Sequence, residues 1–270
     1  MASFMEYVGA DPSGMPPPDL THFPHGDGLA AVTFALAFAI DQGDGNFQPG
    51  WDPSLTPGLI SQYQQSTGAA FVASLAGANV NWSDPPDVGT WVSNATESLW
   101  SMMGTYGLAG IDVDYENGLD GTFADAISQV LNNLRSRASL SLSIAPYAQT
   151  WPVYQQVVSN VGPTELTINY QAYADGLPDQ QSYEALYAGL AQYVESVTPP
   201  EVNLGGYYNL ALGVNTSTPP VGLQPDDIYV VMSNLHDRPN GVNQAFVWSA
   251  EWLSGPDYPV EETLISILSG

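Results

Sequence analysis

Hydrophobic positions along the chain follow two alternating spacings. Short runs of apolar, β-branched or aromatic residues are followed by longer segments with apolar residues at helical spacing, an order typical of parallel βα units rather than of a β-sandwich. The short runs predict eight strands, at residues 5–8, 32–40, 70–76, 110–115, 139–145, 166–171, 202–206 and 245–248. The longer segments predict helices at residues 56–65, 88–106, 123–136, 153–161, 182–197, 224–236 and 260–268.

This pattern predicts an α/β fold, a single (β/α)8 TIM barrel. A chain of 270 residues fits one such barrel better than two small domains. The link between the first two strands, residues 11–29, is rich in Pro and Gly and predicts a loop. No linker, charge block or repeat divides the chain, so we expect one domain over residues 1–270. Its active residues should lie at the carboxyl ends of the strands.

The predicted fourth strand carries the strongest chemical signal. Asp112, Asp114 and Glu116 recur at every second position of an otherwise apolar segment, which places all three side chains on one face. In a barrel that face is the interior, and the apolar residues between them face the helices. Three carboxyl groups in one barrel repel one another and lose hydration, so their pKa values spread apart and a proton is shared. The alternatives are a solvated strand edge or a metal site, which the apolar neighbours and the lack of a nearby histidine disfavour.

The charge balance excludes two classes of partner. Asp and Glu number 28 against 3 Lys and Arg, which gives a net charge of −25, and no lysine is present. Nucleic acid and anionic membrane surfaces should repel such a chain, and no apolar run reaches the roughly 20 residues of a membrane-spanning helix. The shortage of bases has two readings that the sequence leaves open. It would limit positive self-repulsion in acid, or it reflects resistance to trypsin-like cleavage or drift.

The absence of cysteine removes disulfides, thiolate metal sites and thiol nucleophiles. We expect no cofactor and no bound metal, since residues 41–46 lack the ligand spacing of an EF-hand. Residues 1–10 lack the basic and apolar regions of a secretion signal. The compartment therefore stays open: secreted or vacuolar if a signal was removed, cytoplasmic otherwise. We expect a monomer.

A family resemblance becomes specific at the fourth strand. Residues 109–116, AGIDVDYE, resemble the signature of family-18 chitinases, written DGxDxDxE, with Asp112, Asp114 and Glu116 on its last three acids. Ala109 stands where the family usually has its first aspartate. This departure bears on full activity but leaves the acid at position 116 in place.

Three further segments match the family in the right order. Residues 74–77, SLAG, resemble the SLGG run, with Ala76 replacing a glycine. Residues 171–173, QAY, resemble the QFY of plant class III chitinases, and residues 246–249, FVWS, resemble the segment that supplies the indole under the cleaved sugar. Residues 6–9 and 91–99 also resemble narbonin, a legume-seed member of the family that is regarded as catalytically silent.

The resemblance implies a catalytic set of Glu116, Asp114, Asp112 and Tyr173. Glu116 would protonate the glycosidic oxygen while the substrate's own acetamide oxygen attacks the anomeric carbon, a retaining mechanism without a carboxylate nucleophile. Asp114 would orient the acetamide group and stabilise the oxazolinium ion, and Asp112 would share a proton with Asp114. Tyr173 would donate a hydrogen bond to the acetamide oxygen.

The same resemblance implies that Trp248, Gln171 and Ser74 bind substrate, with Trp248 packed under the sugar ring. The expected function is cleavage of β-1,4-linked N-acetylglucosamine polymers, with chitin or chitooligosaccharide as the partner. Two alternatives stay open: a catalytically silent, lectin-like barrel that binds chitin, and an acidic storage protein with the same fold. The narbonin-like segments, Ala76 and Ala109 favour these alternatives.

Overall fold

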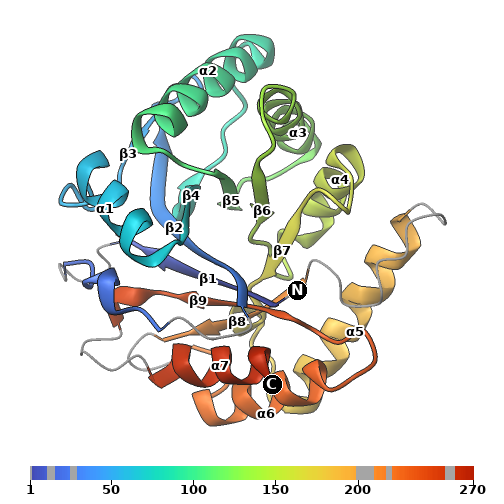
Figure 1. The fold of residues 1–270 in the computed structure, drawn as a ribbon. Coiled ribbons are helices and arrows are strands. Elements are labelled where there is room, and N and C mark those ends of the chain that lie inside the picture. The colour runs from blue at the N-terminus through green and yellow to red at the C-terminus, as the bar shows by residue number, and fades with distance from the viewer. Residues whose placement is uncertain (1, 11–15, 25–28, 199–209, 217–220, 253–258) are drawn as a thin grey trace.

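The computed structural model describes residues 2–10, 16–24, 29–198, 210–216, 221–252 and 259–270. Within them, eight parallel strands close into a barrel in the order β1, β9, β8, β7, β6, β5, β4 and β2, and β2 pairs with β1 (Figure 1). The fold is the predicted TIM barrel. Its strands are β1 (Ala2–Val8), β2 (Leu29–Asp41), β4 (Ala70–Asn81), β5 (Gly110–Asn117), β6 (Ser141–Ile144), β7 (Thr167–Tyr170), β8 (Leu210–Asn215) and β9 (Gln244–Trp248).

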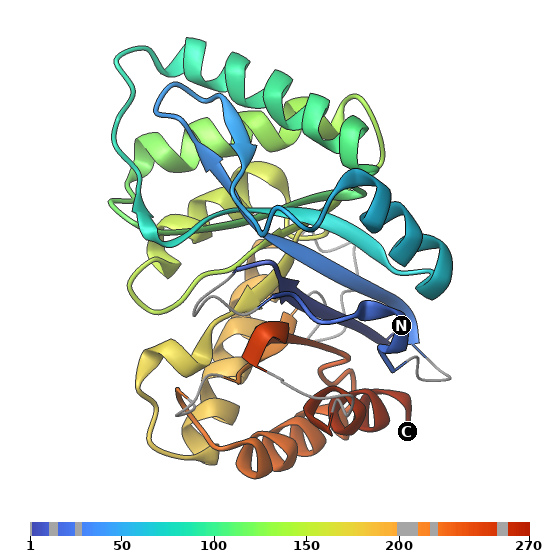
Figure 2. The same ribbon diagram turned by 90° about the vertical axis from the view of Figure 1, so that its left-hand side faces the viewer.

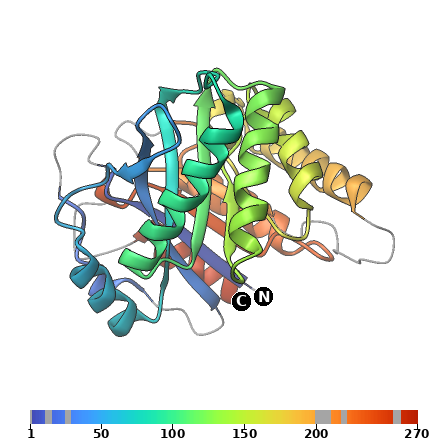
Figure 3. The ribbon, with the colours of Figure 1, turned by 90° about the horizontal axis from the view of Figure 1, so that it is seen from above.

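Helices form a ring around the strands. α2 and α3 lie on one side of the barrel and α6 and α7 on the opposite side (Figure 2), and α2 and α3 pack side by side (Figure 3). The α-helices in the described ranges correspond to the seven predicted ones: α1 (Pro57–Thr67), α2 (Val88–Tyr106), α3 (Gly121–Arg135), α4 (Trp151–Val161), α5 (Gln180–Val197), α6 (Pro225–His236) and α7 (Pro259–Ser269). Four of them begin where a side-chain oxygen caps the first turn, at Thr56, Asp87, Asp120 and Asp179.

The link between β1 and β2 lacks an α-helix in its described part, as its Pro and Gly content predicts. Its described residues contain the 3-10 helix η1 (Leu20–His22). Phe23, directly after η1, packs its ring 5.6 Å from that of Phe4 on β1 and 5.1 Å from that of Phe34 on β2. This aromatic contact covers the barrel where the other strand pairs are covered by a helix.

Two strands differ from the sequence expectation. The strand predicted at 202–206 lies outside the described residues, and the seventh barrel strand is β8, which the sequence analysis did not predict. Residues 41–49 form a hairpin in which β3 (Phe47–Pro49) runs antiparallel to the end of β2. The Asp41 carboxylate accepts hydrogen bonds from the backbone N–H groups of Gly43 and Gly45, at 2.9 and 2.8 Å, which closes the turn.

The core has an outer and an inner part. The outer part, between strands and helices, contains the large side chains, whereas the inner cluster contains small residues such as Ala35 and Ala37 beside Tyr7 and Phe246. A bore lined by small residues leaves room for polar groups along the barrel axis. No helix in the described part of the chain is both long and apolar enough to span a membrane.

Candidate active site

β5 places its three carboxyl groups in the barrel as the alternation predicts. Asp112 is fully buried, Asp114 is 4% exposed and Glu116 is half-buried, while Val113 and Tyr115, between them, belong to the outer core. The strand begins at Gly110, where an added Cβ would lie 1.7 Å from the carbonyl oxygen of Ser141 on β6. Glycine is therefore required for the close approach of these two strands.

Asp112 lies deepest and is held by four hydrogen-bond donors. Its Oδ2 accepts from the hydroxyls of Tyr7 at 3.0 Å and Ser74 at 2.7 Å. Its Oδ1 accepts from Ser143 Oγ at 2.5 Å and from Asn169 Nδ2 at 3.3 Å. Burial raises the pKa of Asp112, and these donors counteract part of the rise by stabilising its charged form.

Asp114 and Glu116 lie above Asp112 towards the carboxyl ends of the strands. Burial raises the pKa of Asp114 well above its usual value, and the negative charges of Glu116 and Asp112 raise it further. Burial also raises the pKa of Glu116. Gln171 Nε2 donates to Asp114 Oδ1 at 2.9 Å and lies 3.5 Å from Glu116 Oε1, so one amide links both carboxyl groups.

Gln171 is itself fixed by two neighbours. Its Nε2 donates to the carbonyl oxygen of Ala145 at 2.7 Å, and its Oε1 accepts from the Tyr173 hydroxyl at 3.0 Å. Tyr173 lies outside the strands, in the 3-10 helix η2 (Ala172–Asp175), which directly follows Gln171. Burial raises the pKa of Tyr173 well above its usual value, so its phenol group remains a hydrogen-bond donor.

A cleft of about 450 Å³ opens above this cluster. It is lined by Asp114, Glu116, Gln171, Tyr173 and Trp248, together with Phe38, Gly77, Asn79 and Asn215. The half-buried indole of Trp248 stacks on Phe38, with ring centroids 5.5 Å apart and an interplanar angle of 23°. Aromatic faces and carboxyl groups therefore line the same cavity, a combination that suits a sugar ring.

The structure places the sequence-derived residues at two depths. Five of them line the cleft: Asp114, Glu116, Gln171, Tyr173 and Trp248. Asp112 and Ser74 lie below it, fully buried and hydrogen-bonded to each other. The Ser74 hydroxyl thus contacts a carboxylate of the cluster rather than the cleft.

Three polar contacts of Asp112 were missed from the sequence: Tyr7 on β1, Ser143 on β6 and Asn169 on β7. Each lies on the inward face of its strand. Strand alternation could have found Ser143, since the register pairs Asp112 with both Ser74 and Ser143.

The two departures from the family signature lie in different places. Ala76 lines the cleft and has a φ of 78°, a left-handed conformation that favours glycine. Ala109 precedes β5 at the other end of the barrel, where its N–H and C=O groups bond to Phe71 and Ser141. Ala109 is therefore remote from the cleft, whereas Ala76 is part of it. In the described ranges, no three His, Asp or Glu side chains form a group that could hold a metal ion.

Similar proteins identify the family. The structure of the catalytic domain of a family GH18 chitinase from the fern Peteris ryukyuensis matches with a TM-score of 0.84 and 25% identity, covering 99% of this chain and 100% of that one. A family 18 chitinase from Crocus vernus matches with a TM-score of 0.83, 25% identity and the same coverage. Chitinase 1 of Tulipa saxatilis subsp. bakeri is 30% identical over 269 residues, which cover 92% of this chain and 80% of the tulip protein. The chain belongs to glycoside hydrolase family 18.

Not every relative of this family-18 chain has an enzyme's name. The RuBisCO-associated protein of Glycine max is 30% identical over 127 residues, which cover 42% of this chain and 45% of the soybean protein. No family model matches the chain. Membership of family 18 and the plant chitinase-like fold therefore rest on the tulip, fern and crocus proteins.

Proposed function

We propose that this family-18 protein is an active chitinase that cleaves β-1,4-linked N-acetylglucosamine polymers by the substrate-assisted retaining mechanism. The observation that carries the proposal is one hydrogen-bonded cluster, in which Gln171 links Asp114, Glu116 and Tyr173 below a cleft that contains Trp248. A silent barrel has no need for buried carboxyl groups that repel one another. The tulip, fern and crocus relatives are each named chitinases, which supports the same substrate class.

In this mechanism Glu116 is the general acid. Its side chain lines the cleft, and burial raises its pKa, so it keeps its proton to a higher pH than an ordinary glutamate and can transfer it to the glycosidic oxygen. Asp114, beside it, accepts a hydrogen bond from the acetamide N–H of the substrate and stabilises the positive charge that develops. Tyr173 transfers its hydrogen bond from Gln171 to the acetamide oxygen when substrate enters.

Asp112 acts through Asp114 rather than on substrate. Four donors stabilise its negative charge, whereas the pKa of Asp114 is raised by burial and by two neighbouring carboxylates. A proton shared between them therefore stays with Asp114 in the resting site. Trp248 supplies an apolar floor for the sugar ring. The protein acts as a monomer with a single domain.

The test is release of a fluorophore from chitobiose and chitotriose glycosides between about pH 3 and pH 7. The Glu116→Gln variant should lose roughly 100- to 10,000-fold in kcat, the usual range for a general acid. Glu195→Gln, an exposed residue on α5, makes the same chemical change as a matched control and should keep wild-type activity.

The competing function is a silent barrel that binds chitin-like sugars or serves as a store. It is favoured by the soybean relative, whose name describes no glycosidase. It is also favoured by Ala76, an alanine with a left-handed backbone conformation where the family has a glycine at the cleft. The absence of turnover in both the wild type and Glu116→Gln would refute the chitinase proposal. Calorimetry with chitooligosaccharides would then separate a lectin-like barrel, which binds them, from a storage protein, which does not.

A further inference from the structure

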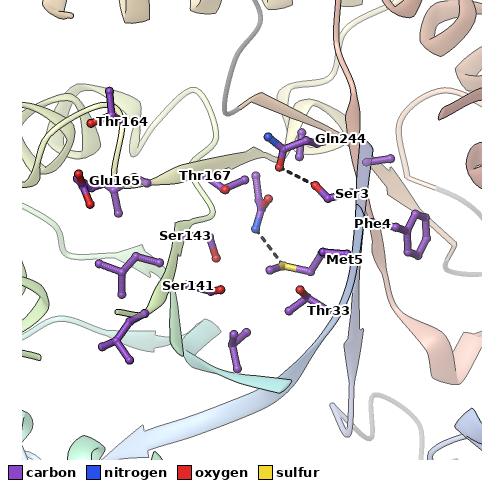
Figure 4. A pocket seen from close by; sticks show the side chains of 18 residues that line it. Ser3, Phe4, Met5, Thr33, Ser141, Ser143, Thr164, Glu165, Thr167 and Gln244 are labelled. Carbon is purple, nitrogen blue, oxygen red and sulfur yellow. Dashed lines mark hydrogen bonds between the residues drawn. The ribbon is translucent and has the colours of Figure 1, made fainter. Parts of the chain in front are cut away.

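A second cavity lies at the opposite end of the barrel from the cleft. Its volume is about 250 Å³, and it is lined by residues at the amino-terminal ends of the strands. Figure 4 shows hydroxyl and amide groups around it, including Ser3 on β1, Thr33 on β2, Ser143 on β6, Thr167 on β7 and Gln244 on β9. We call it the floor cavity.

Small side chains create this space. Bulky branched residues usually fill the layers of a TIM-barrel interior. Here the floor cavity is lined by small residues such as Ala31, Ala211 and Ser143 as well as by larger apolar ones such as Val72 and Leu142, so the strands leave a partly polar chamber instead of a filled apolar layer. The volume far exceeds the roughly 10–15 Å³ that one water molecule requires.

The floor cavity reaches Asp112 through two of its lining residues. Ser143 Oγ and Asn169 Nδ2 both donate to Asp112 Oδ1. Asn169 is fully buried, and its Oδ1 has no hydrogen-bond partner among the described protein atoms. Because a buried amide oxygen without a donor is costly, a small movement of the lining side chains that lets a polar molecule of the cavity reach this atom would be stabilising.

We propose that the floor cavity is a hydration chamber for Asp112, and that Asn169 and Ser143 are the positioning residues through which its water acts. The inference rests on the proposed chitinase function, in which the charge of Asp112 matters. Water fits better than a larger solute because the lining offers scattered hydroxyl and amide groups, and Glu165, the one carboxylate of the lining, already pairs with Arg135 at 3.1 Å.

The physical effect is polarisation. A water molecule that donates to Asn169 Oδ1 makes the Nδ2–H group of the same amide a stronger donor towards Asp112. A water molecule that donates to Ser143 Oγ has the same effect on its hydroxyl proton. Both changes stabilise the charged form of Asp112 from the side that substrate never reaches, which keeps the shared proton on Asp114.

Other groups around Asp112 also bear on its charge and must be held constant. They come from every element packed against it: Tyr7 on β1, Ser74 on β4, Asp114 and Glu116 on β5, Tyr154 on α4, and Tyr173 in η2. A test should therefore change the floor cavity without touching any of these residues or Asn169 and Ser143.

Thr33→Leu meets this requirement, because Thr33 lines the floor cavity but is none of these residues. Thr33 lies beside Met5, whose sulfur contacts Asn169 Nδ2 at 3.1 Å. Leucine fills the space with apolar atoms, whereas the control Thr33→Val keeps the shape and leaves room for water. Ala211→Val fills the cavity from β8 and serves if Thr33→Leu does not fold. The Asp112 titration is followed by ¹³C NMR of aspartate-labelled protein, with Asp112→Asn to assign the signal.

We expect a high-resolution crystal structure to show ordered water within hydrogen-bonding distance of Asn169 Oδ1. We also expect Thr33→Leu or Ala211→Val to shift the titration of Asp112 to higher pH while Thr33→Val leaves it in place. A dry cavity, or equal titrations in the filled and control variants, overturns the inference. Both measurements are independent of turnover, so loss of the proposed chitinase function would be seen separately, as no fluorophore release by the wild type.

Discussion

Two buried glutamates at opposite ends of the chain predict an unusual dependence of stability on pH. Glu6 on β1 and Glu261 in the first turn of α7 are both fully buried, and their carboxyl groups contact each other. No oxygen of either group has a hydrogen-bond partner elsewhere in the described structure. The three arginines of the sequence form ion pairs with other glutamates, Glu165, Glu97 and Glu184.

Such a pair is stable only if it holds a proton. Burial raises the pKa of Glu6 well above its usual value, and the negative charges of Glu261 and Glu251 raise it further. Burial also raises the pKa of Glu261, whose other neighbours include Glu262 and, on α6, Tyr229. Glu6 is therefore the member of the pair that keeps the proton, at the contact between β1 and α7.

The sign of the pH effect follows from the direction of this shift. A carboxyl group with a raised folded-state pKa contributes stability that is fully present below its unfolded pKa, about 4.3 for glutamate, and is lost as the pH rises through the folded pKa. One retained proton gives a slope of about −1.4 kcal/mol per pH unit in the free energy of unfolding. Between pH 5 and pH 7 the loss attributable to Glu6 is up to about 2.7 kcal/mol.

The perturbation is Glu6→Gln, which keeps the shape and a donor for Glu261 but cannot ionise. Its free energy of unfolding, measured by urea denaturation from pH 4 to pH 8, should be similar to or slightly below the wild-type value in acid and above it at pH 7. In thermal scans 1 kcal/mol corresponds to roughly 2–4 °C for a chain of this size, so the variant should gain up to about 5–10 °C at pH 7.

Glu262→Gln provides the matched control, because Glu262 is exposed on the same turn of α7 and the substitution removes the same charge. It should leave the pH slope unchanged. Parallel pH profiles for the wild type and Glu6→Gln would refute the reasoning, since they would mean that Glu6 carries no extra proton in the folded state.

Two further predictions concern the cleft. Ala76→Gly should raise the free energy of unfolding by about 1 kcal/mol, because it relieves a left-handed alanine at φ 78°. The control Ala78→Gly, on the same strand, should lower it by roughly 0.5–1 kcal/mol, as measured by urea denaturation. Equal losses of stability at both sites would contradict this prediction. Trp248→Ala should weaken binding of chitooligosaccharides by about 10-fold or more, measured by calorimetry, because it removes the aromatic floor that stacks on Phe38, and unchanged affinity would mean that the sugar binds elsewhere.

The sequence predicted the barrel and its acidic cluster because both depend on short-range periodicity. Asp112, Asp114 and Glu116 point inward for the same reason that Ile111 points outward, namely the two-residue repeat of a strand. The prediction failed at β8, whose alternation is interrupted by Gly213. An added Cβ at that position would lie 2.3 Å from the Phe246 ring, a constraint that only the packed structure reveals.

The contacts that tune the site were harder to predict than the site. Tyr7 and Asn169 carry no signal in their own segments, and their importance appears only when the barrel closes and their side chains reach Asp112 across its interior. Glu6 reads as an ordinary charged residue because the sequence does not show that α7 covers it. The surroundings of Asp112 and Glu6 are therefore determined by contacts between residues far apart in the chain.

Buried acids at three levels of the molecule favour the same protonated state. Glu6 and Glu261 hold a proton between the barrel and α7, Asp114 holds one in the barrel, and Glu116 must hold one to act on a glycosidic bond. The chain has 28 acidic residues against 3 basic ones. Lowering the pH therefore reduces the repulsion between negative surface charges without building up a large positive net charge. For the proposed chitinase activity, stability and catalysis should therefore both gain as the pH falls from neutral, since protonation strengthens the α7 contact and supplies the proton that Glu116 transfers.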